Sequence, residues 1–306
     1  MPSAATPKIT CAYDQPLQLA ESPLWSADEQ ALYWIDISAC ELHRLHPVSK
    51  SHNFWQLPSE PGCLASDASG GLIIALRTGI VHLDPGSGAI EPLLSAPYDQ
   101  QAERFNDGRC DPAGRLWVGS LREQRDGPLA ALYCIEHGAI RDAGPRATVS
   151  NGVAFSPDGR TLYHTDTSAH AIHAYPFDAS HGTLGEARLF HQFPNDRNAS
   201  DYGGRPDGAA VDSEGGYWCA MYEGGRILRF APDGTLLREI HLPVRCPTMP
   251  AFGGVDLRTL YVTTVRHGRP KAELQELPLS GYLLSLQVDV RGCLETAYIR
   301  GGGPVQ

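Results

Sequence analysis

The sequence predicts an all-β fold, a six-bladed β-propeller with four antiparallel strands in each blade. Six related segments recur along the 306-residue chain, and their apolar alignment residues follow one another at intervals of 40, 44, 46, 55 and 43 residues. This period is typical of propeller blades and other repeat arrays. Glycine and proline are abundant, with 32 and 24 copies, as a fold rich in tight turns requires. The alignment residues are Leu32, Leu72, Leu116, Leu162, Tyr217 and Leu260.

Each repeat begins with two short strands joined by a turn. Turns such as Asp-Pro-Ala-Gly and Ser-Pro-Asp-Gly combine a proline that presets φ with a glycine that accepts the positive φ of a tight hairpin. Several strands show polar–apolar alternation, and no segment shows a helical period, so helices are not expected. Third strands are predicted at 41–47, 79–85, 131–137, 171–177, 226–232 and 282–288, and fourth strands in segments such as 52–58, 187–193 and 236–243.

Two terminal segments compete to complete the last blade. Residues 8–14 and residues 294–300 both have the pattern of a strand, and the sequence leaves the choice open. We expect a single propeller domain over residues 1–306, with residues 1–7 and 301–306 as loose ends. A right-handed β-helix or an open sandwich is the rival architecture, but its repeat is shorter, so the propeller is favoured.

The composition argues against several classes of partner. The net charge is −10 and the chain has no lysine or arginine block, which argues against binding to nucleic acid or to anionic membranes. The first residues lack the pattern of a secretory signal, and no apolar run approaches the roughly 20 residues of a membrane span. Eight scattered cysteines without a C-x-x-C pair suit a reducing compartment. We therefore expect a cytoplasmic protein, a monomer or a small homo-oligomer, that acts on a small molecule.

One position of the repeat, ten or eleven residues before each alignment residue, predicts a metal site. We call this position the shared offset. Inner strands line the channel of a propeller, so residues that open them should converge on its axis. The oxygen-bearing side chains at this offset are two carboxylates and two amides, and a hard divalent cation is the partner that suits such a buried set. Gly62 and Met249, at the same offset, should leave room for substrate or water. Ten or eleven residues before the alignment residues stand Glu21, Gly62, Asn106, Asn151, Asp207 and, in the last repeat, Met249 next to Thr248.

The competing interpretation treats these residues as ordinary turn formers. Asn106-Asp107-Gly108 and Asn151-Gly152 are common turn sequences, and such side chains often bond to nearby backbone. Turn residues have no reason to share one offset with Glu21, however, because glutamate is a poor turn former. The shared offset therefore favours the metal site.

Five segments resemble the senescence-marker-protein/gluconolactonase family of six-bladed propellers. The resemblance runs in order from Glu21 to about Thr264, over ESPLW, RFNDGRCDPAGRLWVGS, NGVAFSPDG, PDGAAVDSEGGYW and CPTMPAFGG followed by LYVTT. It implies a sugar lactonase that opens an aldonolactone, such as glucono-, galactono-, arabinono- or xylonolactone, to the aldonic acid. It also implies one divalent metal ion bound by Glu21, Asn151 and Asp207.

The same resemblance implies roles for residues around the metal. Asn106 is expected beside it, and Arg104 on the sugar hydroxyls or the lactone oxygen. Asp207 is the candidate catalytic residue, as the base that acts on water. Calcium fits the oxygen ligands best, although zinc, manganese, magnesium and iron(II) also fit three protein ligands plus waters.

One family feature has no clear equivalent in this chain. Members often carry a glutamate that touches the sugar, and the loop 119–130 places Gln124 at that position with Glu123 adjacent. Both residues are candidate substrate contacts. The alternative is that this charged stretch is only a solvated loop at the rim of the propeller.

Three other functions share parts of this pattern. A phosphotriesterase on the same metal site would favour an apolar pocket, whereas Arg104, Asn106, Glu123 and Gln124 favour a substrate with many hydroxyl groups. A non-catalytic calcium-binding regulator needs neither Arg104 nor Asn106. A protein-interaction propeller leaves the carboxylates and amides of the channel unexplained.

Overall fold

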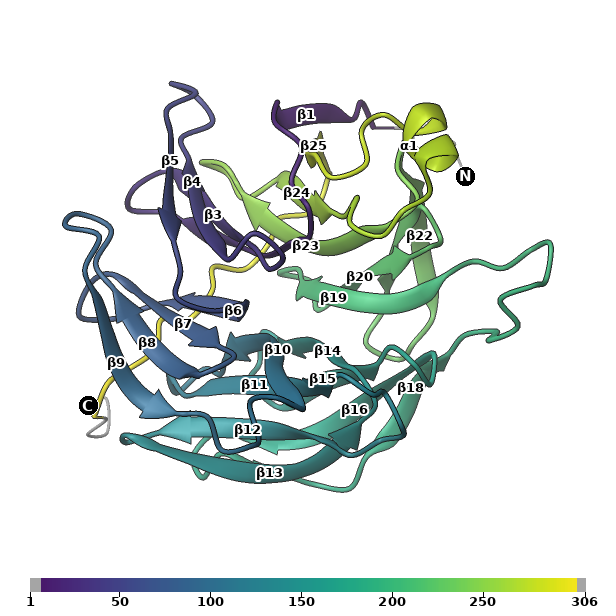
Figure 1. The fold of residues 1–306 in the computed structure, drawn as a ribbon. Coiled ribbons are helices and arrows are strands. Elements are labelled where there is room, and N and C mark those ends of the chain that lie inside the picture. The colour runs from purple at the N-terminus through teal and green to yellow at the C-terminus, as the bar shows by residue number, and fades with distance from the viewer. Residues whose placement is uncertain (1–6, 302–306) are drawn as a thin grey trace.

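The computed structural model describes residues 7–301 as a ring of six antiparallel sheets (Figure 1). Five sheets have four strands, and the fourth blade adds a two-residue strand to its four. The prediction of a six-bladed propeller is therefore confirmed. The predicted loose ends, 1–7 and 301–306, fall outside the described residues except for Pro7 and Gly301.

The strands follow the chain from the innermost to the outermost position of each blade, except in the last blade. Blade 1 contains β2 (Ala20–Ser26), β3 (Ala31–Asp36), β4 (Glu41–Leu45) and β5 (His52–Gln56). Blade 2 contains β6 (Pro61–Ser66), β7 (Leu72–Leu76), β8 (Gly79–Leu83) and β9 (Ile90–Ser95). Blade 3 contains β10 (Glu103–Cys110), β11 (Leu116–Arg122), β12 (Ala130–Glu136) and β13 (Ala139–Ala147).

The second half of the ring repeats this order. Blade 4 contains β14 (Ser150–Phe155), β15 (Thr161–Asp166), β16 (Ala171–Asp178), the short β17 (Thr183–Leu184) and β18 (Arg188–Gln192). Blade 5 contains β19 (Arg205–Val211), β20 (Tyr217–Tyr222), β21 (Arg226–Phe230) and β22 (Leu236–His241). Blade 6 contains β23 (Pro247–Gly253), β24 (Thr259–Thr264), β25 (Leu283–Gln287) and β1 (Thr10–Tyr13).

The N-terminal strand closes the ring. β1 pairs antiparallel with β25, with Thr10 opposite Ser285 and Cys11 opposite Leu284, so the outermost strand of the last blade comes from the start of the chain. The competing segment 294–300 forms no strand of this blade. Pairing the start of the chain with the last repeat closes the ring by backbone hydrogen bonds.

Residues 290–300, the C-terminal strap, cross the opposite mouth of the ring, where the yellow end of the chain runs behind the blades in Figure 1. Gly292 bridges to Asp212 in the first turn of blade 5, and Tyr298 bridges to Asp67 in that of blade 2. Ile299 donates its N–H to the carbonyl of Gly114 in blade 3 at 2.9 Å. The strap ties three blades together at the end of the channel far from the candidate site.

The long insertion 266–281 contains α1 (Lys271–Glu276), which corrects the expectation of a fold without helices. Arg269 holds this six-residue helix through two bonds to Glu273, at 2.7 and 2.6 Å. Such a local ion pair gives no periodic apolar pattern, so the sequence carried no helical signal. Within residues 7–301, the structure contains no helix that is long and apolar enough to cross a membrane.

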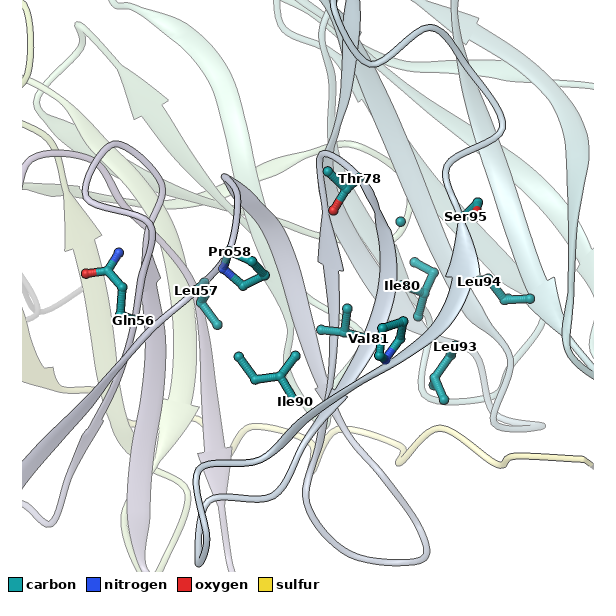
Figure 2. Close-up of a pocket in the computed structure, with 12 residues that line it drawn as sticks. Gln56, Leu57, Pro58, Thr78, Ile80, Val81, Ile90, Leu93, Leu94 and Ser95 are labelled. Atoms are coloured by element: carbon teal, nitrogen blue, oxygen red, sulfur yellow. The ribbon is translucent and has the colours of Figure 1, made fainter.

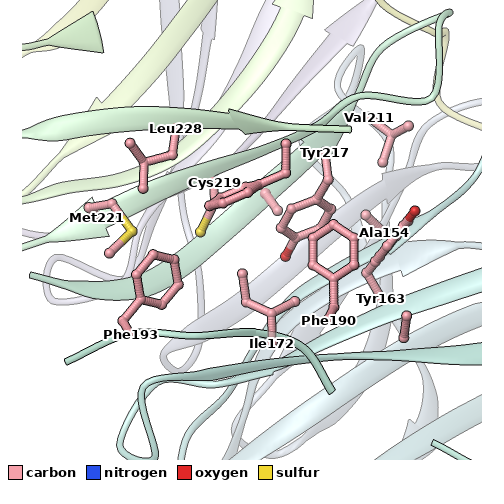
Figure 3. Packing of buried hydrophobic residues seen from close by; sticks show 13 residues of the cluster. Ala154, Tyr163, Ile172, Phe190, Phe193, Val211, Tyr217, Cys219, Met221 and Leu228 are labelled. Atoms are coloured by element: carbon pink, nitrogen blue, oxygen red, sulfur yellow. The ribbon is translucent and has the colours of Figure 1, made fainter. Parts of the chain in front are cut away.

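The hydrophobic core lies between neighbouring blades. Figure 3 shows one such interface, in which Tyr163 and Phe190 of blade 4 pack near Tyr217 of blade 5, with ring centroids 4.8 Å apart for Tyr163–Tyr217 and 5.7 Å for Phe190–Tyr217. Tyr217 is fully buried, and burying a large side chain of this kind stabilises a fold by roughly 1.5–3 kcal/mol. Packing of this kind fixes the inner strands relative to each other and so fixes the site.

Candidate active site

The candidate site lies where the six inner strands begin. Each inner strand carries a one-residue irregularity of register against its neighbour at this end, as between Glu21 and Leu24 in β2 and between Asn151 and Ala154 in β14. A bulge of this type re-aims a side chain that would otherwise follow the strict alternation of a strand. Equivalent register positions are held by Glu21, Gly62, Asn106, Asn151, Asp207 and Thr248.

The sixth position is therefore Thr248 and not Met249. Pro247 lies opposite Thr264 at the end of β24, just as Pro206 lies opposite Met221 at the end of β20, so the residue after each proline is the equivalent one. Thr248 donates its hydroxyl to the carbonyl of Ala20 at 2.6 Å, which joins blade 6 to blade 1. Thr248 therefore connects two blades, and the sixth ring position does not carry the apolar side chain that was expected there.

The expected opening beside Gly62 and Met249 is also absent. A Cβ on Gly62 would meet the carbonyl carbon and oxygen of Phe105 at 2.5 Å and the nitrogen of Asn106 at 2.8 Å, so backbone fills that space. A Cβ on Gly208 would lie 2.6 Å from the side chain of Met249. Both glycines allow neighbouring inner strands to approach closely, and the expectation of free room on this side was wrong.

A cavity of about 200 Å³ opens instead between blades 1, 3, 4, 5 and 6, and blade 2 contributes no residue to its lining. It brings together Glu21, Arg104, Asn106, Asn151 and Asp207, which the sequence singled out. Its lining also includes Leu19, Ile37, Leu121, Arg125, Val149, Thr167, Ser168, Arg205, Tyr222, Val265 and His267.

A larger groove of about 710 Å³ lies elsewhere, along blade 2 beside the end of β5 (Figure 2). Its lining is dominated by aliphatic side chains such as Leu57, Ile80 and Leu93 and holds no ionisable side chain. Chemistry that moves protons or binds a cation cannot be based there, so the smaller polar cavity is the candidate active site.

A chain of hydrogen bonds connects the polar residues of this cavity. Arg104 Nη1 donates to Asn106 Oδ1 at 2.8 Å, and Asn106 Nδ2 donates to Asn151 Oδ1 at 2.7 Å. Asn151 Nδ2 in turn donates to Asp207 Oδ1 at 2.6 Å. Three blades thus contribute to one network, and each amide has a fixed orientation because it donates on one side and accepts on the other.

Blade 4 supports this network from behind. Asn151 Nδ2 also donates to Thr167 Oγ1 at 2.9 Å, and the Thr167 hydroxyl donates to the carbonyl of Pro206 at 2.7 Å. Thr167 therefore holds the side chain of Asn151 and the strand that carries Asp207 in one arrangement. The repeat gave no signal for Thr167, because it follows the second strand and lies outside the shared offset.

The electrostatics of the cavity call for a cation. Burial raises the pKa of Glu21 well above its usual range, and the nearby charges of Asp207 and Asp107 raise it further. The pKa of Asp207 is raised as well, mainly by burial, with Arg205 opposing the rise. Asp107, below the ring, has a pKa raised to about 6 by burial, and its Oδ1 is buried without a hydrogen-bond partner among the described residues.

A hard divalent cation fits this donor set. Glu21, Asn151 and Asp207 can all bind through oxygen, and a divalent cation offsets the cost of burying two carboxylates, which is the main cause of their raised pKa values. Within the described part of the chain, no three His, Cys, Asp or Glu side chains gather closely enough to hold an ion by themselves. The amide of Asn151 is therefore an essential part of the set.

The rim loop places the predicted sugar contacts differently. Glu123 is largely exposed and forms an ion pair with Arg77, and Gln124 is exposed. Neither lines the cavity, whereas the next residue, Arg125, does. Arg125 has a positive φ of 49°, a backbone conformation that non-glycine residues adopt infrequently. The sequence could not reveal this local bend.

Arg205 is a second cavity residue that the sequence analysis missed. It stands two positions before Asp207, as Arg104 stands two positions before Asn106, and both lie opposite equivalent residues of the second strand, Tyr222 and Leu121. The two arginines thus form part of a second layer of the ring, one step above the first. The shared offset was present in the sequence and could have identified Arg205.

Comparisons with known proteins identify the family of this chain. A family model described as the SMP-30/gluconolactonase/LRE-like region matches residues 19–266. A 6-deoxy-6-sulfogluconolactonase of Pseudomonas putida is 48% identical over 292 residues, which cover 95% of this chain and 98% of that protein. The crystal structure of a calcium-binding protein, regucalcin, from Agrobacterium tumefaciens has a TM-score of 0.89 and 28% identity, covering 96% of this chain and 97% of that one.

A gluconolactonase structure from Xanthomonas campestris has a TM-score of 0.73 at 21% identity, with 93% of this chain and 95% of that chain covered, and it supports the fold alone. The family model spans most of the chain and contains every residue of the hydrogen-bonded network. The resemblance identified in the sequence is confirmed: the chain belongs to the SMP-30/gluconolactonase/LRE-like family, a family of sugar lactonases.

Proposed function

We propose that this protein hydrolyses the ring ester of a sugar lactone to the aldonic acid, with one divalent metal ion held by Glu21, Asn151 and Asp207. The enzyme class that the sequence predicts, a carboxylic-ester hydrolase acting on lactones, is confirmed by the family and by the lactonase from Pseudomonas putida. The observation that carries the metal-dependent proposal is the network that joins Asn106, Asn151 and the buried carboxylate of Asp207 at the floor of the cavity.

The substrate we place first is 6-deoxy-6-sulfogluconolactone. The support is the relative of that name, which shares 48% of its residues with this chain over nearly its full length. Glucono-, galactono-, arabinono- and xylonolactone, with the same ring ester, are the further candidates. Calcium is the metal we place first, because the Agrobacterium tumefaciens relative is described as calcium-binding; zinc, manganese, magnesium and iron(II) are to be compared with it.

Hydrolysis needs a water molecule, a base and donors for the developing oxyanion. When bound, the divalent ion supplies Lewis-acid polarisation of the carbonyl and neutralises the carboxylates around it. Asp207 Oδ1 is held by Asn151, and its Oδ2 has no hydrogen-bond partner among the described residues, so Oδ2 is free to orient and deprotonate the water. The water oxygen bonds to the carbonyl carbon, the ring C–O bond breaks, and the abstracted proton passes to the departing ring oxygen.

Arg104 is the proposed donor to the lactone carbonyl. Its Nη1 is engaged by the carbonyl of Phe105 at 2.9 Å and by Asn106, but Nε and Nη2 have no partner within residues 7–301. Both amide hydrogens of Asn106 are occupied, by the carbonyl of Ser150 at 2.8 Å and by Asn151. We therefore assign Asn106 the role of positioning Arg104 and Asn151, and not that of a donor to substrate.

Among the residues of the rim loop, we propose Arg125 as the substrate contact in place of Glu123 and Gln124, because it lines the cavity. The proposed location is the cytoplasm, where the eight free cysteines stay reduced. The proposed partner is the small-molecule lactone alone, and the proposed assembly is a monomer or a small homo-oligomer.

Hydrolysis followed with a pH indicator tests the proposal. Each lactone is measured with untreated enzyme, with chelated enzyme and with chelated enzyme after addition of each metal, and the spontaneous rate without enzyme is subtracted. We expect chelation to remove the enzymatic rate and one metal to restore it, and Asp207→Asn to stay inactive in every case. Full turnover after complete removal of metal contradicts the metal-dependent mechanism, and the absence of hydrolysis with every lactone contradicts the function.

A further inference from the structure

We propose that Arg125 and Arg205 form an anion-binding subsite, which makes this enzyme selective for sugar lactones that carry a negatively charged substituent outside the ring ester. The substituent we assign to it is a sulfonate. The inference rests on the proposed lactonase function, and it adds which residues read the substrate and by what property.

The two arginines reach the cavity from different blades. Arg205 belongs to β19 of blade 5, two residues before Asp207, and Arg125 follows β11 of blade 3. Asn151 of blade 4 lies between these blades in the order of the ring. A lactone whose carbonyl lies between Arg104 and Asp207 therefore shares the cavity with two more guanidinium groups, those of Arg125 and Arg205.

Both guanidinium groups lack a full complement of protein partners. Arg125 has no side-chain hydrogen bond or ion pair with any residue between 7 and 301. Arg205 Nε is buried without a partner in that same range, and the nearest carboxylate to Arg205 is that of Glu223, at 3.7 Å. Burial of the unpaired Arg205 Nε donor is costly, and the exposed Arg125 guanidinium has no protein partner among the described residues, so both side chains have donors free for a ligand with acceptor oxygens.

Glu223 neutralises Arg205 only in part, because its carboxylate is shared among three arginines. Arg197 donates to both of its carboxylate oxygens, at 2.9 and 2.8 Å, and Arg269 lies 3.3 Å away. At the same rim Arg77 shows the opposite case, since Glu60 and Glu123 bind it from two sides. Arg125 and Arg205 thus keep donors for a ligand, whereas two carboxylates take up the donors of Arg77.

The charge of the cavity differs from the charge of the whole chain. Three guanidinium groups, from Arg104, Arg125 and Arg205, face the two carboxylates of Glu21 and Asp207. A bound divalent ion leaves this small space with a clear positive excess, although the protein carries a net charge of −10. Concave, partly buried clusters of one sign attract ligands of the other sign, so the cavity favours an anionic lactone over a neutral one.

Arg205 is also held in place. Its guanidinium carbon lies 4.9 Å from the centroid of the Tyr222 ring, which itself lines the cavity. A cation–π contact of this kind keeps the planar guanidinium in one orientation, with its N–H groups available to a group of oxygen acceptors. Sulfonate presents three such oxygens, whereas a neutral hydroxyl offers a weaker, single acceptor.

The test compares lactones that share one ring and differ in one substituent. Gluconolactone is neutral, 6-deoxy-6-sulfogluconolactone carries a sulfonate, and 6-phosphogluconolactone carries a phosphate. The variants are Arg125→Gln, Arg205→Gln and Arg205→Lys, the last of which keeps a charge against Tyr222. Arg122→Gln is the matched control, because Arg122 ends β11 three positions before Arg125, pairs with Asp126 at 2.9 Å and does not line the cavity.

We expect each Gln variant to lower kcat/KM for the sulfonated lactone about 10- to 100-fold, because charge-assisted hydrogen bonds to the sulfonate are lost. Most of this decrease should come from a higher KM. Gluconolactone should change less than about threefold, because it lacks the anion that these residues bind. Arg205→Lys should retain part of the preference, and Arg122→Gln should behave as the unaltered enzyme with all three substrates.

Calorimetric binding of the product, 6-deoxy-6-sulfogluconate, gives a readout that needs no turnover. Tight binding that Arg125→Gln and Arg205→Gln weaken supports the subsite even where hydrolysis is slow. A preference for the phosphorylated lactone overturns the assignment to sulfonate and leaves an anion subsite for phosphate. Equal losses with neutral and anionic lactones overturn the subsite itself. Failure of all lactones to react, with normal product binding, contradicts the proposed function and not this inference.

Discussion

Asn151 donates its side-chain amide to Asp207 at 2.6 Å, and this bond joins the inner strands of blades 4 and 5 at the floor of the cavity. A neutral amide is the right neighbour for a buried carboxylate, because it donates a hydrogen bond without competing for a positive charge. The same side chain has an oxygen to offer to a cation. Asn151 therefore connects the stability of the ring to its proposed chemistry.

Replacing Glu21 by glutamine should shift stability in opposite directions with and without metal. In the metal-free protein the change removes one of the mutually repelling buried carboxylates, so we expect the Tm to rise by about 2–4 °C, equivalent to about 1 kcal/mol. With metal, we expect affinity to fall at least about tenfold, since an anionic ligand is lost. Thermal unfolding with chelator and with a calcium series measures both effects.

Glu186 supplies the control, because it is exposed and lies between β17 and β18 at the outer edge of blade 4, away from the cavity. Glu186→Gln should leave both the metal-free Tm and the metal-induced increase unchanged. An unaltered metal-induced increase in the Glu21→Gln protein would remove Glu21 from the proposed ligand set.

Replacing Arg104 by glutamine should reduce kcat about 10²- to 10³-fold, the usual cost of losing one donor to a developing oxyanion. KM should change little, because this donor acts mainly in the transition state. The measurement is steady-state hydrolysis by fully metal-loaded protein, with metal content determined on the same sample. Arg104→Lys retains the charge but not the fork geometry, and it should recover only part of the rate. A kcat within threefold of the unaltered value for Arg104→Gln contradicts the assignment.

Adding one methyl group at Gly62 should damage both fold and site. Its Cβ would meet the backbone of Phe105 at 2.5 Å, where no flexible side chain can move aside, so we expect a loss of about 1–3 kcal/mol in the free energy of unfolding. Relief of the clash must also displace Asn106, and activity should fall with stability. Denaturant unfolding and lactone hydrolysis check the two effects.

Gly86→Ala is the matched control for this change. Its Cβ would approach only a carboxylate oxygen of Asp84, at 3.3 Å, and that side chain can rotate away. Equal stability of the Gly62→Ala and Gly86→Ala proteins would show that blades 2 and 3 are not as closely packed as described.

Stability should decrease in mild acid because of His43 in blade 1. Burial, together with the neighbouring His52, lowers its pKa to about 3, whereas an unfolded histidine has a pKa of about 6.5. Between these values the unfolded chain binds a proton that the folded chain excludes, so stability is complete above pH 6.5 and is lost as the pH falls. This histidine alone should cost about 2 kcal/mol between pH 7 and pH 5.

Denaturant unfolding at several pH values measures this loss. His43→Phe keeps a ring against Trp34, whose centroid lies 5.1 Å away, and removes the titrating group. We expect a shallower decrease between pH 7 and pH 5 in the variant, and its stability at pH 7 gives the cost of the altered packing. An unchanged slope would mean that His43 takes up a proton in the folded state.

Much of the site could be predicted because the fold is a repeat. The period of the repeated segments fixes the number of blades, and a common offset must then converge on the axis of a closed ring. Glu21, Asn106, Asn151 and Asp207 were found in this way, and all four line the cavity together with Arg104. Arg205 could have been found by the same reasoning, since its offset matches that of Arg104.

Other features of the site depend on contacts between blades, and a repeat pattern in the sequence does not predict such contacts. The absence of a side chain at Gly62 predicts space, but the backbone of Phe105 and Asn106 in the next blade fills it. The sixth ring position moved from Met249 to Thr248, because the position of an irregularity in register is set by strand pairing and not by residue count. The choice of β1 over residues 294–300 to close the ring likewise depended on which segment could reach β25.

The sequence by itself determined the propeller and the ring of carboxylates and amides, because both follow from a period and an offset that strand geometry translates directly into positions around an axis. The tertiary structure decided where the ring opens and which loop side chain reaches the opening. Arg125 lines the cavity while its neighbours Glu123 and Gln124 do not, because a bend in the loop backbone turns successive side chains in different directions. This bend is a local turn, closed by the bond from the Arg125 N–H to the carbonyl of Arg122 at 3.0 Å, and it leaves no periodic trace in the chain.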